Sequence, residues 1–134
     1  MISSTDQLGR LVELNEAPKR IISLVPSQTE LLHDFRLKNE IIGITKFCVH
    51  PAHWREQKTV IGGTKNFKVD LIKSLNPDLV IANKEENTEE GIREISDFCP
   101  VWVSDVQDIV SALGMIKGIG QIVSRQEDAE KLII

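Results

Sequence analysis

Residues 20–30 join an apolar strand directly to the start of a helix, and this junction constrains the fold more than any other feature. The apolar run 21–25 is nearly continuous, which is typical of a strand buried on both faces of a parallel sheet. Pro26 ends the strand, and Ser27 followed three residues later by Glu30 predicts a capping box. Ligands of open α/β sheets bind beyond the carboxyl ends of the strands, so the junction is a candidate binding place. A plain strand-to-helix turn is the alternative.

Strand-like and helix-like segments alternate along the whole chain. Strands are expected at residues 8–14 (an edge strand or a small hairpin), 21–25, 40–45, 59–61, 78–82 and 101–103. Helices are expected at residues 27–35, 66–75, 87–95 and 105–123 and from residue 124 onward, with an irregular loop at 46–54. Strands separated by helices at this spacing imply βαβ units. The predicted fold class is therefore α/β, with a mainly parallel sheet flanked by helices.

Capping residues mark three further helix starts. Asn66 precedes one apolar-periodic segment, Asn87 with Glu90 precedes the next, and Ser124 with Glu127 forms a second S-x-x-E pattern. Each short polar side chain can accept a hydrogen bond from a backbone amide of the first turn. These residues are therefore the predicted N-caps.

Composition and charge exclude several classes of protein. A chain of 134 residues can bury one core but is short for two lobes. The net charge of -4 and the lack of a basic stripe argue against a nucleic-acid partner. No run approaches the roughly 18 apolar residues of a membrane span, and the first residues lack the segments of a secretory signal. Cys48 and Cys99 are expected to be free thiols.

The loops around residues 46–66 carry side chains that could bind a metal ion or a phosphate group. Cys48, His50 and His53 are close enough in sequence to meet one zinc or copper ion, although a loop folded on itself is the alternative. Residues 62–65 place two glycines and a lysine before a helix, as in a phosphate cradle, but without the spacing of a P-loop. No G-x-S-x-G elbow is present, which disfavours acyl transfer.

The ordered set of motifs at residues 19–30, 42–45, 61–66 and 75–82 resembles one known family. It is similar to the N-terminal lobe of the cobalamin and iron-siderophore class of ABC-transporter substrate-binding proteins, the helical-backbone metal receptor family. The similarity runs from about residue 8 to the end of the chain. It implies a Rossmann-like lobe over residues 1–123 and the start of an interlobe connector helix at 124–134, with the C-terminal lobe absent from this chain. A metal chelate would bind between the two lobes.

The resemblance also implies which residues face the ligand. By position these are Pro26, Ser27 and Gln28, then Phe47, Cys48 and His50, then Thr64 and Lys65. Phe47 stands where cobalamin binders place an aromatic against the corrin, whereas Thr64 stands where they can place a tryptophan, a departure that disfavours cobalamin. Asp70 stands where the family places an acidic residue that docks on arginines of the permease. Its position in a first helical turn also has a purely local explanation, because the helix dipole favours negative charge there.

The leading hypothesis is a non-enzymatic lobe that binds a ferric siderophore, haem or cobalamin and delivers it to the permease subunits of an ABC importer. The chelate would hold the metal, so no cofactor and no protein metal site are expected. The resemblance implies the periplasm or the cell surface, while the lack of a signal peptide in these residues leaves the cytoplasm open. The rival hypotheses are a Rossmann-like enzyme acting on a nucleotide or phosphorylated metabolite, and a direct zinc receptor.

Overall fold

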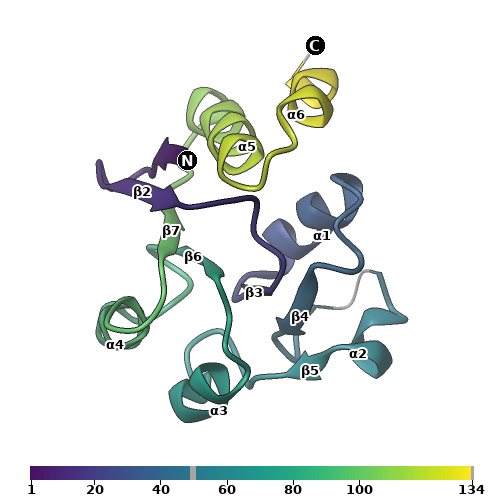
Figure 1. Cartoon of the computed structure of the whole chain (residues 1–134), viewed down its shortest axis with the longest axis vertical. Coiled ribbons are helices and arrows are strands. Elements are labelled where there is room, and N and C mark those ends of the chain that lie inside the picture. The colour runs from purple at the N-terminus through teal and green to yellow at the C-terminus, as the bar shows by residue number, and fades with distance from the viewer. Residues whose placement is uncertain (49–50, 134) are drawn as a thin grey trace.

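A parallel β-sheet forms the centre of the computed structural model, which describes residues 1–48 and 51–133 (Figure 1). Its strands are β3 (Ile21–Ser23), β4 (Ile41–Ile44), β5 (Thr59–Val60), β6 (Leu79–Asn83) and β7 (Val101–Ser104). They lie in the order β5-β4-β3-β6-β7, and each neighbouring pair is parallel. The predicted α/β class is confirmed, and every strand predicted for the main sheet is present.

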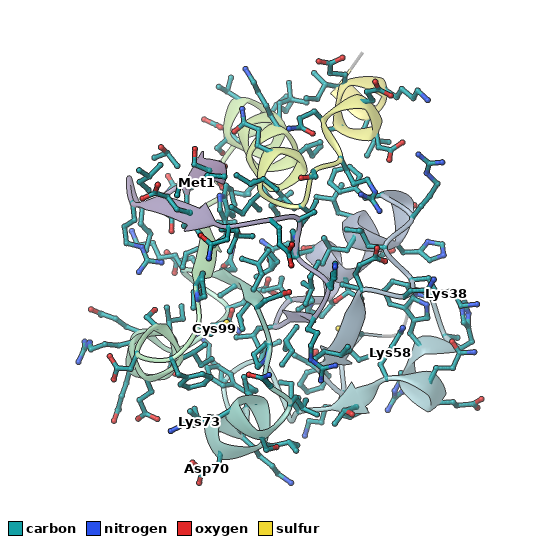
Figure 2. The ribbon with its side chains drawn as sticks, viewed as in Figure 1. Met1, Lys38, Lys58, Asp70, Lys73 and Cys99 are labelled. Carbon is teal, nitrogen blue, oxygen red and sulfur yellow. The ribbon has the colours of Figure 1, made fainter. Side chains whose placement is uncertain are left out.

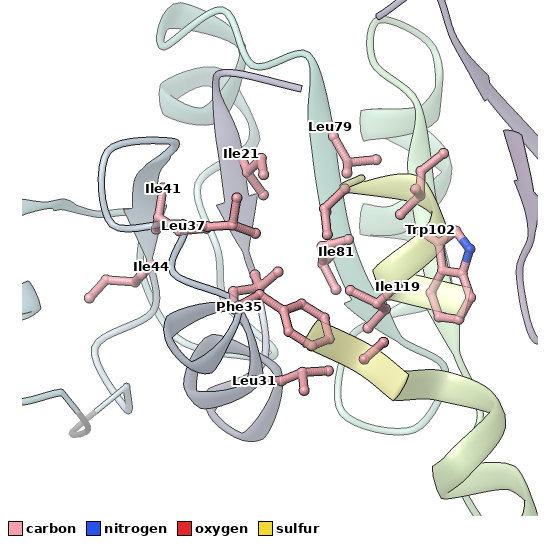
Figure 3. Close-up of a cluster of buried hydrophobic side chains, with 14 of the residues drawn as sticks. Ile21, Leu31, Phe35, Leu37, Ile41, Ile44, Leu79, Ile81, Trp102 and Ile119 are labelled. Atoms are coloured by element: carbon pink, nitrogen blue, oxygen red, sulfur yellow. The ribbon is translucent and has the colours of Figure 1, made fainter. Parts of the chain in front are cut away.

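Helices cover both faces of this sheet (Figure 1). They are α1 (Pro26–Asp34), α2 (Trp54–Gln57), α3 (Val69–Ser74), α4 (Glu89–Ser96), α5 (Ile109–Ile122) and α6 (Gln126–Ile133). On one face, Phe35 at the end of α1 and Ile119 of α5 share a core cluster with Trp102 of β7 (Figure 3). On the other face, Ile72 of α3 and Ile95 of α4 belong to a second cluster. Burial on both faces explains why the strands are so uniformly apolar.

The order of the strands creates a switch point in the middle of the sheet. The chain leaves β3, passes through α1 and adds β4 and then β5 on one side. It then returns through α3 and adds β6 and β7 on the other side of β3. The connections after β3 and β6 therefore diverge onto opposite faces of the sheet. In open α/β sheets, the crevice beyond the carboxyl ends of such a strand pair is the usual ligand-binding place.

A small hairpin of β1 (Ile2–Thr5) and β2 (Leu11–Leu14) covers the β7 edge of the sheet. The backbone N–H of Gln7, in the hairpin turn, donates to the carbonyl of Val103 at 3.0 Å. The N–H of Val103 donates to the carboxylate of Asp6 at 3.2 Å. Unpaired edge groups are thus satisfied within the chain, which protects the edge from pairing with other molecules. Residues 8–14, predicted to form an edge strand or a small hairpin, supply part of the turn and the second strand of this hairpin, whose first strand lies earlier in the chain.

The predicted capping box at the first helix is wrong. Helix α1 begins at Pro26, and among the described residues no side chain caps it. Ser27 therefore lies inside the first turn, where it cannot form the box with Glu30. Proline is favoured at the first helical position because its φ is already helical and its missing N–H is not needed there. The helix consequently starts two residues earlier than the polar pattern suggests.

Two other predicted caps are also wrong. An antiparallel bridge between Gly62 and Phe67 carries the chain past Asn66, and α3 begins only after this bridge. Ser124 has a φ of 58°, in the left-handed region, and α6 begins two residues later. An N-cap residue has extended backbone dihedrals, so a left-handed residue cannot serve as one. Tertiary contacts, and not the local polar pattern, therefore set both helix starts.

Helix α4 is capped by Thr88, one residue after the predicted cap Asn87. The Thr88 hydroxyl accepts a hydrogen bond from the backbone N–H of Gly91 at 3.1 Å. Asn87 is buried and uses its side chain elsewhere. The prediction of a cap at Asn87 is therefore wrong by one residue, because both residues can cap a helix and only the tertiary contacts distinguish them.

Thr88→Ala is expected to lower the free energy of unfolding by about 1 kcal/mol, because the Gly91 amide loses its acceptor. Asn66→Ala, at a cap predicted wrongly from the sequence, is expected to change it by less than about 0.5 kcal/mol. Urea denaturation of both variants measures the difference. Equal losses would mean that the Thr88 hydroxyl does not contribute as an N-cap.

Candidate functional site

The candidate site is the carboxyl edge of the sheet, where the loops after β3, β4, β5 and β6 meet. Pro26 is half-buried and Ser27 is exposed at the first turn of α1, directly after β3. Thr64, in the loop after β5, is half-buried, and Lys65 is exposed. The Lys65 ammonium donates to the carbonyl of Glu85, in the loop after β6. These predicted site residues come from separate loops and lie at one edge.

Phe47 is an exposed apolar group in the loops that form this edge. Its side chain is 52% exposed, in the loop after β4. The ammonium of Lys46 lies 5.2 Å from the centroid of the Phe47 ring, a cation–π contact. A Cβ added at Gly63 would lie 3.4 Å from the ring, so the aromatic ring packs closely against the glycine-containing loop. The Phe47 ring therefore joins the loops after β4 and β5 while keeping half of its surface free.

Gln28 is placed differently from its neighbours. It is 1% exposed, and its amide nitrogen donates to the Ser104 hydroxyl at the end of β7. The same nitrogen lies 3.6 Å from the sulfur of Met115 in α5. Among the described residues, no atom hydrogen-bonds to the Gln28 side-chain oxygen. Gln28 therefore ties α1 to β7 and α5 beneath the edge, while Ser27 faces outward.

Cys48 is also buried beneath the edge. It is 1% exposed, and its sulfur lies 3.1 Å from the Thr29 hydroxyl and 3.2 Å from the Thr45 hydroxyl. His50 lies outside the described residues. His53 is exposed beside the Trp54 ring. Within residues 1–48 and 51–133, no three His, Cys, Asp or Glu side chains lie close enough together to hold one metal ion. The zinc-receptor hypothesis therefore gains no support from these residues.

The second thiol, Cys99, does not belong to the candidate site. It precedes β7, at the amino edge of the sheet, and is 4% exposed (Figure 2). Burial, with the nearby Asp78 carboxylate as a smaller cause, raises the pKa of the Cys99 thiol to about 12. A thiol with this pKa stays protonated at neutral pH and is a poor nucleophile. Cys99 is therefore a core residue.

Two asparagines at the switch point are functional candidates that sequence reasoning missed. Asn87 donates from its side-chain amide to the carbonyl of Thr64 at 2.9 Å and to that of Leu24 at 3.2 Å. Its side-chain oxygen accepts from the backbone N–H of Asn83 at 2.8 Å. The sequence gives one signal for this role: Asn83 lies at the end of a buried strand, and Asn87 follows four residues later. The same position of Asn87, just before an apolar-periodic segment, predicts a helix cap instead.

Asp70 lies on the surface of α3, the helix that follows the loop after β5. Its carboxylate is in the first turn of that helix and is exposed. In Figure 2 the side chain points away from the body of the molecule. The structure thus leaves Asp70 accessible to another surface, as a docking role requires.

The sequence matches a family described as Periplasmic binding protein over residues 21–133. An ABC transporter substrate-binding lipoprotein of Bacillus subtilis is 26% identical over 136 residues, which cover 98% of this chain and 43% of the lipoprotein. A vitamin B12-binding protein of Vibrio campbellii is 25% identical over 118 residues, which cover 87% of this chain and 42% of that protein. The chain thus spans less than half the length of these relatives.

Solved structures share the Rossmann-like fold. A petrobactin-binding protein of Bacillus subtilis superposes with a TM-score of 0.86 at 19% identity, over 97% of this chain and 47% of that one. A periplasmic heme-binding protein of Pseudomonas aeruginosa gives a TM-score of 0.78 at 18% identity, over 85% and 41%. Within the described residues, no helix has both the length and the apolarity to cross a membrane. Because the family match extends over most of the sequence, the chain belongs to the periplasmic binding protein family.

Proposed function

We propose that this chain is the N-terminal ligand-binding lobe of an ABC-importer substrate-binding protein whose ligand is a metal chelate. The observation that carries the proposal is the half-exposed Phe47 ring, seated on the glycine-containing loop at the carboxyl edge of the sheet. A flat apolar surface beside a few polar groups suits a chelate such as a ferric siderophore, haem or a corrinoid. The family match and the names of the relatives support the same class of ligand.

The proposed ligand brings its own metal, and the lobe performs no catalysis. The buried Cys48 sulfur lies between two threonine hydroxyls, and Cys99 belongs to the core. Ser27, Thr64 and Lys65 would contact the periphery of the chelate, with Phe47 against its apolar face. A ligand held at one open edge gains only part of the contacts that a two-lobed site provides, so we expect weak binding by this lobe alone.

The proposed partner of the lobe is the permease of the importer, outside the cytoplasmic membrane. Asp70 is exposed and extends from the surface of α3. An exposed carboxylate of this kind suits a basic surface, because complementary charge directs association and orientation. The names of the family and of the Bacillus subtilis lipoprotein support this location and partner.

Quenching of tryptophan fluorescence by haemin, cyanocobalamin and a panel of ferric siderophores tests the proposal. Trp54 and Trp102 are both fully buried, so only ligands that absorb their emission are expected to quench them strongly. We expect one chelate to give saturable quenching. Phe47→Ala is expected to weaken that binding about tenfold, because it removes the central apolar contact.

Leu11→Ala is the matched control, since Leu11 is a similarly exposed apolar residue (61%) on the hairpin strand β2. It is expected to leave the affinity unchanged. ATP and NAD are titrated in parallel by thermal shift, because a bound ligand raises the midpoint of unfolding. Stabilisation by a nucleotide with no response to any chelate would contradict the proposal and favour the Rossmann-like enzyme.

A further inference from the structure

We infer that Asn87 is a positioning residue that holds the ligand-facing loops in their binding arrangement. The inference about ligand affinity rests on the proposed function, whereas the inference about loop order does not. Asn87 is 2% exposed and lies at the switch point between β3 and β6. It does not itself reach the surface, so it acts through the loops that it joins.

The side-chain amide of Asn87 connects three separate loops. Its nitrogen donates to Thr64 O, in the loop after β5, and to Leu24 O, directly after β3. Its oxygen accepts from the backbone N–H of Asn83, at the end of β6. Thr64 and Lys65 in the first loop, and Pro26 and Ser27 after the second, are the proposed ligand contacts. One side chain therefore fixes the spacing between two sets of ligand-facing residues.

The chemistry at this position specifically requires an amide. Two carbonyl oxygens need N–H donors while one backbone N–H needs an acceptor, and a short amide supplies both. Aspartate has the same shape but would place a carboxylate against two carbonyl oxygens. Alanine would leave the carbonyls of Leu24 and Thr64 without their Asn87 donor, and buried carbonyls without partners are strongly unfavourable.

The loop that carries Asn87 is itself anchored to the sheet. The Asn83 side-chain oxygen accepts from the backbone N–H groups of Glu85 and Glu86 at 2.8 and 3.0 Å. The Asn83 side-chain nitrogen donates to the Ser104 hydroxyl at 2.9 Å, and Gln28 donates to the same hydroxyl. A buried, connected polar network of this kind restricts the loops to one arrangement before any ligand arrives.

Amide hydrogen exchange of the unliganded chain tests the loop order directly. Asn87→Ala and Asn87→Asp are both expected to accelerate exchange at least tenfold at residues 61–67 and 24–29 relative to the rest of the chain. The control is Ile95→Val, which loses one methylene from the core around α4 without touching the network. Ile95→Val is expected to raise the exchange rate, but not preferentially at residues 61–67 and 24–29. A uniform rise in the Asn87 variants, or the same pattern in the control, would overturn the inference.

Titration with haemin, cyanocobalamin and the ferric siderophores, at a temperature where all variants are folded, tests the consequence for binding. Both Asn87 variants are expected to bind about tenfold more weakly than the unsubstituted chain, and Ile95→Val equally well. Unchanged affinity in the Asn87 variants would overturn the role in binding. If the unsubstituted chain binds none of the chelates, the proposed function fails, and hydrogen exchange alone decides whether Asn87 orders the loops.

Discussion

Gly118→Ala is expected to destabilise the fold by roughly 2–3 kcal/mol, although alanine is the better helix former. A Cβ at Gly118 would lie 2.4 Å from Cζ2 of Trp102 and 3.0 Å from its Cη2. The indole cannot easily move, because it is fully buried and its Nε1 donates to the Ser4 hydroxyl at 3.0 Å. That hydroxyl donates in turn to the Gly118 carbonyl at 2.9 Å. The added methyl group must therefore separate α5 from the sheet.

Gly114→Ala is the matched control, one helical turn earlier in α5. The nearest heavy atom to its added Cβ would be the Gln7 side-chain nitrogen at 3.5 Å, an ordinary contact. Here the helix propensity of alanine is unopposed, and a gain of up to about 1 kcal/mol is expected. Urea denaturation measures both variants. If the free energy of unfolding falls in Gly118→Ala and rises in Gly114→Ala, the effect of packing is separated from that of helix propensity. An unchanged free energy of unfolding in Gly118→Ala would contradict the close contact between α5 and Trp102.

Asp6→Ala is expected to cost about 3 kcal/mol of folding stability, since it removes a fully buried carboxylate that organises the hairpin turn. One oxygen accepts from the backbone N–H groups of Leu8 and Arg10, at 3.0 and 2.9 Å. The other accepts from the Arg10 guanidinium at 3.0 and 3.1 Å and from the Val103 N–H at 3.2 Å. Without the carboxylate, the Val103 amide at the sheet edge has no acceptor in the turn.

Asp6→Asn is expected to fall between the original and Asp6→Ala, because an amide oxygen can still accept from the turn while its nitrogen faces other donors. Glu16→Ala is the control, since the Glu16–Lys19 pair is 4.0 Å apart and both side chains are at least 75% exposed. Exposed pairs contribute little, so a change below about 0.5 kcal/mol is expected. Thermal and urea unfolding measure all three. A loss from Asp6→Ala as small as that from Glu16→Ala would contradict the role assigned to this carboxylate.

The fold exposes some of the residues predicted for the site and buries others. Ser27, Phe47 and Lys65 are exposed at the carboxyl edge. Gln28 and Cys48 are buried just beneath it, because successive side chains of a helix or a turn point in different directions. Position in the sequence thus located the loops, but it could not separate the exposed residues of these loops from the buried residues beneath them.

The sequence by itself determined the strand pattern, the parallel α/β class and the edge of the sheet where the candidate site lies. Apolar runs such as residues 21–25 carry that information locally, since burial on both faces requires it. Only the tertiary structure decided where helices begin and what the polar residues do. Asn87 shows the reason, because its partners Leu24 and Thr64 are 63 and 23 residues away in the sequence. A local pattern shows that an asparagine can accept and donate hydrogen bonds, whereas the fold determines which distant carbonyls it meets.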